Sequence, residues 1–313
     1  MSFATETKNE LSRIEPAKKC CMLAEISGFL RVSGSLRLAG GGRFKIVITT
    51  ENPAVARHYK KLIKEYFQVD TELLVTEAQG LKKGHAYMLS IGPEMRSEQI
   101  LRETGILLVR EGNNYISDGI YDGIIRSKCC RKAYLRGIFM GAGSVNDPSN
   151  SYHLEFVCAS RTLANDLKKM INSFVDLSAK VVARKDSFIV YMKNSEYISD
   201  TLAIMGASSQ VFAFEDVRIK KGLVNDAGRI TNCDNANTDR ALDAAEKQIA
   251  AIRKIEAAKG LDWLPEKLRA AAQLRLEHPE ASLTQLGEMM EPPMKKSGIN
   301  NRLRKIDEIA AKL

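Results

Sequence analysis

The chain has 313 residues, of which 44% are hydrophobic and 27% charged, and it carries a formal net charge of +9. This composition is ordinary for a soluble globular protein, and the length leaves room for two or three domains. No apolar run approaches the ~18 residues of a membrane span, and the N-terminus lacks the pattern of a signal peptide. The sequence therefore predicts a cytoplasmic protein without membrane association. The basic excess permits a polyanionic partner, but a solvated surface with slightly more lysine accounts for it equally well.

Six cysteines occur in the chain, and none of them belongs to a C-x-x-C pair. Adjacent cysteines are poorly placed to share one tetrahedral ion, so the sequence predicts no metal site and no cofactor. In a cytoplasmic chain these residues are expected to be reduced thiols, mostly buried as small apolar groups. The six are Cys20, Cys21, Cys129, Cys130, Cys158 and Cys233.

The first two-thirds of the chain repeats itself at an offset of 109 residues, which relates Gly28 to Gly137 and Gly34 to Gly143. Each copy reads as a helix, two strands, a second helix, two further strands and a last helix. Strands that come in consecutive pairs are typical of antiparallel sheets. The pattern predicts an α+β fold made of two αββαββα units in tandem.

The predicted elements follow in chain order. In the first copy a strand at 44–50 precedes a helix that starts near Pro53, and two further strands flank a turn at 79–85. In the second copy a strand at 152–158 and a hairpin around 184–186 take the same places. The last helices are expected at 97–105 and 197–206.

The opening helix of each copy carries small residues four positions apart, namely Ala24 and Gly28 in the first and Gly137 and Gly141 in the second. Residues four apart lie on one helical face, and small side chains there let two helix backbones approach closely. The two opening helices are therefore predicted to pack together on a pseudo-two-fold axis. The alternative is that each glycine merely caps or bends its own helix.

Twin glycine-ended helices that each lead into strands resemble the LAGLIDADG homing-endonuclease fold. Residues 135–144, LRGIFMGAGS, match the motif of that family position by position, and residues 26–35, ISGFLRVSGS, match it more loosely. The resemblance covers about residues 18–210. It implies that the tandem repeat is a degenerate LAGLIDADG-like scaffold.

In that family, one acidic residue at the end of each opening helix holds divalent metal over the scissile phosphates. The matching positions here are Ser33 and Ala142, and neither side chain is a carboxylate. Asp147 lies past the helix end, and its counterpart by the repeat offset is Leu38. The resemblance therefore implies the endonuclease scaffold without its catalytic acids, and a protein that is not an enzyme.

The segment after the repeats begins with a polar run at 229–237 that reads as a linker, although it could also contact nucleic acid. Apolar residues then recur every three to four positions from 238 to 259, which predicts a long helix that ends at Gly260. The expected domains are 1–125 and 126–225 for the repeats, 226–260 for linker and long helix, and 261–313 for a last domain.

Residues 262–313 are typical of a compact helical domain with helices at 266–277, 283–290 and 295–312. Ser282 is an N-cap candidate, and Gln285 three residues later completes a capping box. A short helix, a tight turn and a longer helix form the plan of a helix-turn-helix, whose second helix enters the major groove of DNA.

The final helix starts with basic and amide side chains and keeps its apolar residues at helical spacing. Asparagine can read adenine, and arginine or lysine can read guanine or hold phosphate. An amphipathic helix with a solvated basic face is the alternative. The residues predicted to contact DNA are Ser282, Thr284, Gln285, Lys295, Lys296, Ser297, Asn300, Asn301, Arg302, Arg304 and Lys305.

A degenerate LAGLIDADG-like repeat followed by an Asn-rich segment and a helix-turn-helix resembles the WhiA family of bacterial regulators. Residues 229–249 and 282–310 carry this resemblance, although that family usually has serine near Lys295 and histidine near Asn301. The resemblance implies a nucleoid-associated protein that binds double-stranded DNA. It also implies a role in sporulation gene control in filamentous bacteria, and in cell division and chromosome segregation in other Gram-positive bacteria.

Two other functions stay open at this point. The repeat domain could bind a protein or a small ligand while the tail alone holds DNA. An active homing endonuclease is the third possibility, and it predicts magnesium-dependent cleavage. The oligomeric state is not specified by the sequence.

Overall fold

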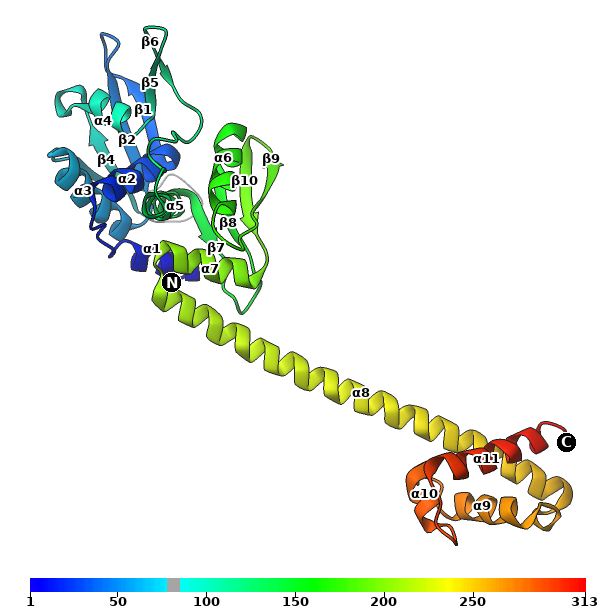
Figure 1. Ribbon diagram of the computed structural model, residues 1–313. Coiled ribbons are helices and arrows are strands. Elements are labelled where there is room, and N and C mark those ends of the chain that lie inside the picture. The colour runs from blue at the N-terminus through cyan, green and yellow to red at the C-terminus, as the bar shows by residue number, and fades with distance from the viewer. Residues whose placement is uncertain (78–84) are drawn as a thin grey trace. The chain divides into compact units, whose positions relative to one another are not determined.

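The computed structural model describes residues 1–77 and 85–313, which form two compact units, Met1–Lys220 and Lys221–Leu313 (Figure 1). Each unit has a hydrophobic core of its own. Among the described residues, no helix is both long and apolar enough to cross a lipid bilayer.

The first unit contains the two copies of αββαββα, so the predicted α+β tandem repeat is confirmed. The first copy comprises α2 (Lys19–Ser33), β1 (Gly34–Leu38), β2 (Phe44–Thr50), α3 (Pro53–Phe67), β3 (Glu72–Glu77), β4 (His85–Ile91) and α4 (Ser97–Glu103). The second comprises α5 (Lys128–Ala142), β7 (Gly143–Val145), β8 (Leu154–Cys158), α6 (Arg161–Asn172), β9 (Lys180–Arg184), β10 (Ser187–Met192) and α7 (Ser195–Met205). The turn expected at 79–85 lies, except for its last residue, outside the described residues.

Each copy builds one four-stranded antiparallel sheet, in the order β1-β2-β4-β3 and β7-β8-β10-β9. Side chains alternate between the two faces of a strand. On β2, Ile46 and Ile48 enter the core with helices α2 and α3, while Lys45 and Thr49 lie on the opposite face. Side chains of β8 and β10 alternate in the same way. The face of each sheet away from these helices, hereafter its open face, exposes residues such as Thr49 and Val157, although Val47 and Ile189 on it are buried.

Among the described residues of the first unit, a helix and a β-hairpin were not predicted. Helix α1 (Phe3–Leu11) precedes the first copy, and Leu11 is fully buried in the core. A hairpin of β5 (Leu107–Arg110) and β6 (Asn113–Ile116) follows α4. Its turn residues Glu111 and Gly112 both adopt positive φ, which is the backbone that a tight two-residue hairpin requires.

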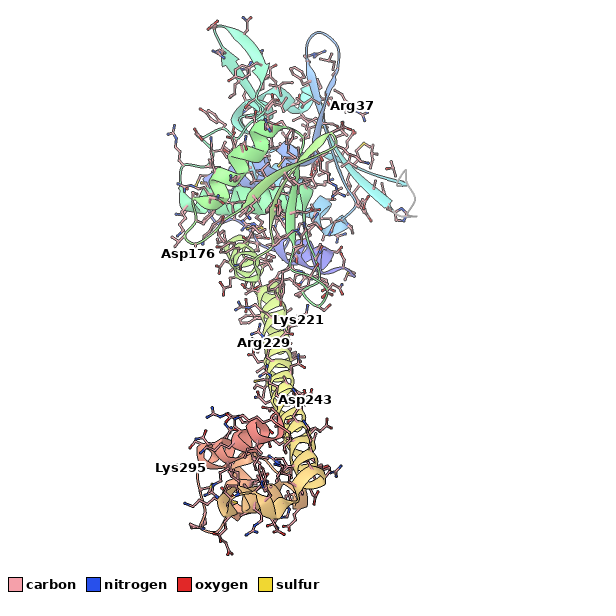
Figure 2. All side chains as sticks on the ribbon, turned by 90° about the vertical axis from the view of Figure 1, so that its right-hand side faces the viewer. Arg37, Asp176, Lys221, Arg229, Asp243 and Lys295 are labelled. Carbon is pink, nitrogen blue, oxygen red and sulfur yellow. The ribbon has the colours of Figure 1, made fainter. Side chains whose placement is uncertain are left out.

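The polar run at 229–237 is helical and is not an irregular linker. It belongs to α8 (Ser208–Lys259), which also begins well before the predicted start at residue 238. Arg229 and Asp243 project outward from this helix (Figure 2), and the Arg229 side chain is 83% exposed. The run itself is rich in asparagine, aspartate and threonine, which favour turns and helix caps, and this composition suggested a linker.

The second unit contains the rest of α8 and three further helices, α9 (Glu266–Glu277), α10 (Leu283–Met289) and α11 (Lys296–Ala310). Their boundaries agree closely with the predicted ones. Ile252 and Ile255 of α8 pack with apolar residues of these helices to form the second core.

Candidate nucleic-acid interface

Helix α10 begins at the predicted capping box. The Ser282 hydroxyl accepts a hydrogen bond from the Gln285 N–H at 3.3 Å, and the Gln285 side-chain oxygen accepts one from the Ser282 N–H at 2.8 Å. This pair satisfies two backbone donors at the helix start. Both side chains and Thr284 are exposed, so the cap fixes the positions of three residues predicted to contact DNA.

The turn between α10 and α11 depends on a backbone contact at Gly287. The Met294 N–H donates a hydrogen bond to the Gly287 carbonyl at 2.8 Å. A Cβ atom on Gly287 would overlap the Met294 carbonyl oxygen. Glycine therefore allows the chain entering α11 to cross directly over α10, which holds the two helices in a helix-turn-helix.

The approach to α10 is held by Arg275, an arginine that is only 2% exposed. Its guanidinium donates hydrogen bonds to the Ala281 carbonyl at 2.6 Å and to the Pro279 carbonyl at 3.4 Å. Burial lowers the pKa of Arg275, although an arginine keeps its charge at neutral pH. Sequence reasoning missed this residue because an arginine in a basic domain is expected on the surface.

Helix α11 sorts its side chains onto two faces. Ile299, Leu303 and Ile306 lie in the core and are at most 1% exposed. Successive residues are about 100° apart around a helix of 3.6 residues per turn, so the basic and amide residues of the first turns point away from that core. This exposed set, hereafter the α11 open face, consists of Lys296, Ser297, Asn300, Asn301, Arg304 and Lys305.

Two of the DNA-contacting residues predicted between positions 295 and 305 lie apart from the α11 open face. Arg302 is half-buried, and its guanidinium donates to the Lys267 carbonyl of α9 at 3.4 Å. Lys295 is the N-cap of α11 and is exposed beside the turn (Figure 2). The structure thus places Arg302 where it supports the packing of α11 on α9.

The acidic residues of α11, Asp307 and Glu308, lie near its C-terminal end. Glu308 lies 3.7 Å from Arg304, and both side chains are more than half exposed (62% and 68%), so this pair adds little stability and leaves Arg304 free to turn. Asp307 is half-buried, and one of its carboxylate oxygens is buried without a hydrogen-bond partner. Burial raises the pKa of this carboxyl group.

A groove of about 390 Å³ lies within the second unit between α8 and the start of α10. Asn237 and Thr238 of α8 line one side, and Thr284, Gln285 and Lys296 line the other. Asn237, the last residue of the polar run, therefore borders the same groove as three of the predicted DNA-contacting residues of α10 and α11.

In the first unit, α2 and α5 cross at their small residues. A Cβ atom on Gly28 would overlap the Tyr134 carbonyl oxygen, and one on Gly137 would overlap the Glu25 carbonyl oxygen. The two contacts are equivalent under the repeat offset. Gly141 packs against the end of α2, and Ala24 is fully buried.

The positions of the nuclease acids lie at the C-terminal ends of these two helices. Ser33 ends α2, Ala142 ends α5, and the Ser33 hydroxyl would collide with a Cβ on Gly141. A depression beside Gly141 is lined by Lys8 and by a single acidic residue, Glu51. Burial lowers the pKa of Lys8, and the charge of Glu51 partly opposes that shift.

A buried ionic cluster joins the two repeats beside the helix crossing. The Glu25 carboxylate, which is fully buried, lies 2.7 Å from His58 Nε2 and 2.8 Å from Arg136 Nε. Arg136 also donates to the Met205 carbonyl at 3.1 Å. No sequence motif predicted this cluster, whose members come from α2, α3 and α5.

The two cysteine pairs also come together. Cys20 and Cys21 near the start of α2 meet Cys129 and Cys130 near the start of α5, with all four Sγ atoms within 4.8 Å of one another. The expectation that adjacent cysteines cannot share an ion considered each pair alone, and the packing of the two helices removes that objection.

Three protein-family models match successive parts of the chain, one for each repeat and one for the C-terminal helices. Residues 19–107 match the model of the WhiA N-terminal LAGLIDADG-like domain, residues 131–223 that of the WhiA LAGLIDADG-like domain, and residues 227–310 that of the WhiA C-terminal HTH domain. The chain belongs to the WhiA family. It is 46% identical to the probable cell division protein WhiA of Alkaliphilus oremlandii over 100% of this chain and 98% of that one. It is 43% identical to its counterpart in Alkaliphilus metalliredigens over 99% and 98% of the two chains.

Solved structures of the family share the fold. The crystal structure of full-length WhiA from Thermatoga maritima aligns with a TM-score of 0.59 at 23% identity, over 100% of this chain and 99% of that one. The N-terminal LAGLIDADG domain of a WhiA protein aligns with a TM-score of 0.51 at 20% identity, over 66% of this chain and 90% of that one. The predicted family and the predicted combination of a LAGLIDADG-like repeat with a helix-turn-helix are thus confirmed.

Proposed function

We propose that this protein is a non-enzymatic, nucleoid-associated regulator that binds double-stranded DNA through α11. The observation that carries this proposal is the α11 open face, where Lys296, Asn300, Asn301 and Arg304 are exposed on the side away from the core. Amide side chains supply base readout, and the cations supply phosphate contacts. Relatives named as probable cell division proteins support a role in cell division, with chromosome segregation or sporulation as the related processes.

Binding of the full chain to its genomic target can be measured by fluorescence anisotropy, with the target taken from a genome-wide binding profile. The double variant Asn300→Ala/Asn301→Ala is expected to lose most of its preference for that target over unrelated DNA. Lys267→Ala, an exposed residue of α9 outside the α11 open face, is the matched control and should keep it. A double variant that keeps full sequence preference would overturn the assignment of α11 as the reading helix.

We further propose that the LAGLIDADG-like repeat does not cut DNA. Ser33 and Ala142 provide no carboxylate pair at the ends of α2 and α5, and the neighbouring depression holds Lys8 with only one acid. Metal-assisted phosphodiester hydrolysis needs charged oxygen ligands for its divalent cations. Incubation of bound target plasmid with Mg²⁺ or Mn²⁺ should leave it supercoiled, whereas metal-dependent linear or nicked product would contradict the proposal.

A second candidate function for the repeat domain is supported by the composition of its open sheet faces. Leu74, Val157 and Val182 lie on these faces and are 52%, 43% and 47% exposed, respectively. The basic side chains on the described parts of these faces are Arg37 and Lys45 on the first sheet and Lys180 and Arg184 on the second, and they are partly offset by Glu72 and Glu155. A surface that tracks a DNA duplex is normally far more basic, so a protein partner fits these faces better than DNA does.

The salt dependence of DNA binding separates these roles in the intact chain. Each lost phosphate contact reduces the slope of log K against log salt by about 1. Arg37→Glu/Lys45→Glu should leave that slope unchanged if the sheets do not touch DNA. Lys168→Glu/Lys169→Glu, which changes the same charge on exposed positions of α6, is the control. A reduced slope in the sheet variant alone would assign the sheets to DNA.

A further inference from the structure

The four cysteines of the two pairs occupy equivalent positions at one end of the helix axis. Cys20 and Cys21 are the second and third residues of α2, and Cys129 and Cys130 are the second and third residues of α5. Because the two helices cross closely at their glycines, their first turns lie side by side. The four Sγ atoms come within 4.8 Å of one another, which no other set of three or more potential ligands achieves in the described part of the chain.

The spacing of the sulfur atoms suits one tetrahedral ion. Zinc with Zn–S bonds of about 2.3 Å holds its four sulfurs about 3.8 Å apart. Small side-chain rotations bring atoms that lie within 4.8 Å to that separation. A multi-iron cluster would hold its thiolates around a larger core, and four protein sulfurs leave no open position for catalysis. The separation of the sulfur atoms is therefore compatible with a closed four-thiolate zinc site.

The electrostatic surroundings favour four thiolates. Zinc with four thiolates carries a net charge of −2, and each helix N-terminus contributes roughly +0.5 elementary charge. Neither α2 nor α5 has an acidic residue in its first turn, and Lys19 and Lys128 begin the two helices. The hydroxyl of Ser127, the N-cap of α5, lies 3.2 Å from Cys129 Sγ, where it can donate a hydrogen bond to a thiolate.

The burial of the four residues fits an ion at the edge of the core. Cys21 and Cys130 are 8% and 5% exposed, whereas Cys20 is exposed and Cys129 half-buried. A role as small apolar filling accounts for the first two but not for the exposed Cys20. The open side also gives an ion a path to the site.

We propose that Cys20, Cys21, Cys129 and Cys130 bind one zinc ion that clamps the two repeats together at the N-terminal ends of α2 and α5. On binding, each protonated thiol gives up its proton to the buffer and forms a bond to zinc, so uptake releases up to four protons. No oxidant or reductant takes part. Occupancy is therefore expected to fall as the pH is lowered.

The test is metal analysis of the full chain purified under reducing conditions without chelator. Elemental analysis should give one zinc per chain, and Cys20→Ser/Cys129→Ser should reduce that to near zero. Cys233→Ser, which removes an exposed cysteine outside the cluster, is the control and should keep one zinc. Cobalt loaded in place of zinc should give the intense visible bands of a tetrahedral thiolate site in the wild type and the control only.

Several outcomes would overturn the proposal. These are a metal-free wild type that also fails to take up cobalt, zinc retained by the double serine variant, and iron in place of zinc at the same cysteines. A disulfide between the pairs, detected by mass spectrometry in the purified chain, would do so as well. If the double variant fails to fold, the single Cys20→Ser at the exposed position decides, because its cobalt spectrum must then show a changed ligand set.

Discussion

The buried ionic cluster that joins the repeats gives a strong stability prediction. Glu25→Ala removes the carboxylate that lies 2.7 Å from His58 and 2.8 Å from Arg136. Arg136 is 8% exposed, and its one other hydrogen-bond acceptor among the described residues is the Met205 carbonyl at 3.1 Å. Removing one member of a buried charge pair costs about 3–5 kcal/mol, because the remaining charge stays desolvated. We expect Glu25→Ala to lower the free energy of unfolding of the first unit by that amount.

The assay follows from the position of the single tryptophan. Trp263 lies in the second unit, so its fluorescence reports the unfolding of that unit, whereas far-ultraviolet circular dichroism reports both. In urea, Glu25→Ala should shift the dichroism transition to lower denaturant and leave the fluorescence transition in place.

Two further variants make the result interpretable. Glu98→Ala breaks an ion pair with Arg102 at 2.8 Å in the same unit, but those side chains are 48% and 39% exposed, and we expect a loss of at most ~0.5 kcal/mol. Glu25→Met/Arg136→Met removes both charges and should recover much of the stability lost in Glu25→Ala. A dichroism midpoint that changes no more in Glu25→Ala than in Glu98→Ala would refute the assignment of the cluster as the link between repeats.

Three other predictions concern the second unit. Lys296→Ala should weaken binding to all DNA sequences alike and reduce the salt slope by about 1, as anisotropy titrations at several salt concentrations would reveal. Asp307→Asn should stabilise this unit at neutral pH, because burial raises the pKa of Asp307 and ionisation therefore favours the unfolded chain. The gain in stability should appear as the pH rises through and above the usual carboxyl pKa of 3.8 and should vanish below it. Trp263 fluorescence in urea measures this gain. An equal gain in Glu308→Gln, at an exposed position, would show that burial of Asp307 is not its cause. Gly287→Ala should lower the Trp263 unfolding midpoint and weaken DNA binding, since its Cβ would overlap the Met294 carbonyl; an unchanged midpoint would show that the turn can shift freely.

The sequence predicted what depends on local or periodic signals. The offset of 109 residues located the twin helices, and the matching strand order of the two sheets follows from it. Ser282 and Gln285 predicted the start of α10 because a capping box acts over three residues. The hairpin of β5 and β6 could have been found from Glu111-Gly112 between two short alternating segments.

Local and periodic signals in the sequence do not reveal contacts between residues that lie far apart along the chain. Glu25 and Arg136 are 111 residues apart, and neither stands in a motif that marks a buried charge. Arg302 illustrates a similar limit. The sequence predicts that it contacts DNA, and only the structure shows that its guanidinium also reaches the Lys267 carbonyl of α9. Composition identifies a basic helix, but only the core-facing residues decide which of its cations remain exposed.

The cysteines show what a sequence argument leaves out when it considers one helix at a time. Within either helix, adjacent thiols cannot surround an ion. Yet the repeat that predicts a close crossing of α2 and α5 also predicts that residues equidistant from the crossing glycines meet in space. Cys20 stands eight residues before Gly28, and Cys129 stands eight residues before Gly137. Pseudo-symmetry thus brings the thiols of two separate pairs together in one cluster. It also places them at the opposite end of the axis from Ser33 and Ala142, so a metal bound there would strengthen the scaffold without approaching the positions that, in a nuclease, hold the catalytic metals.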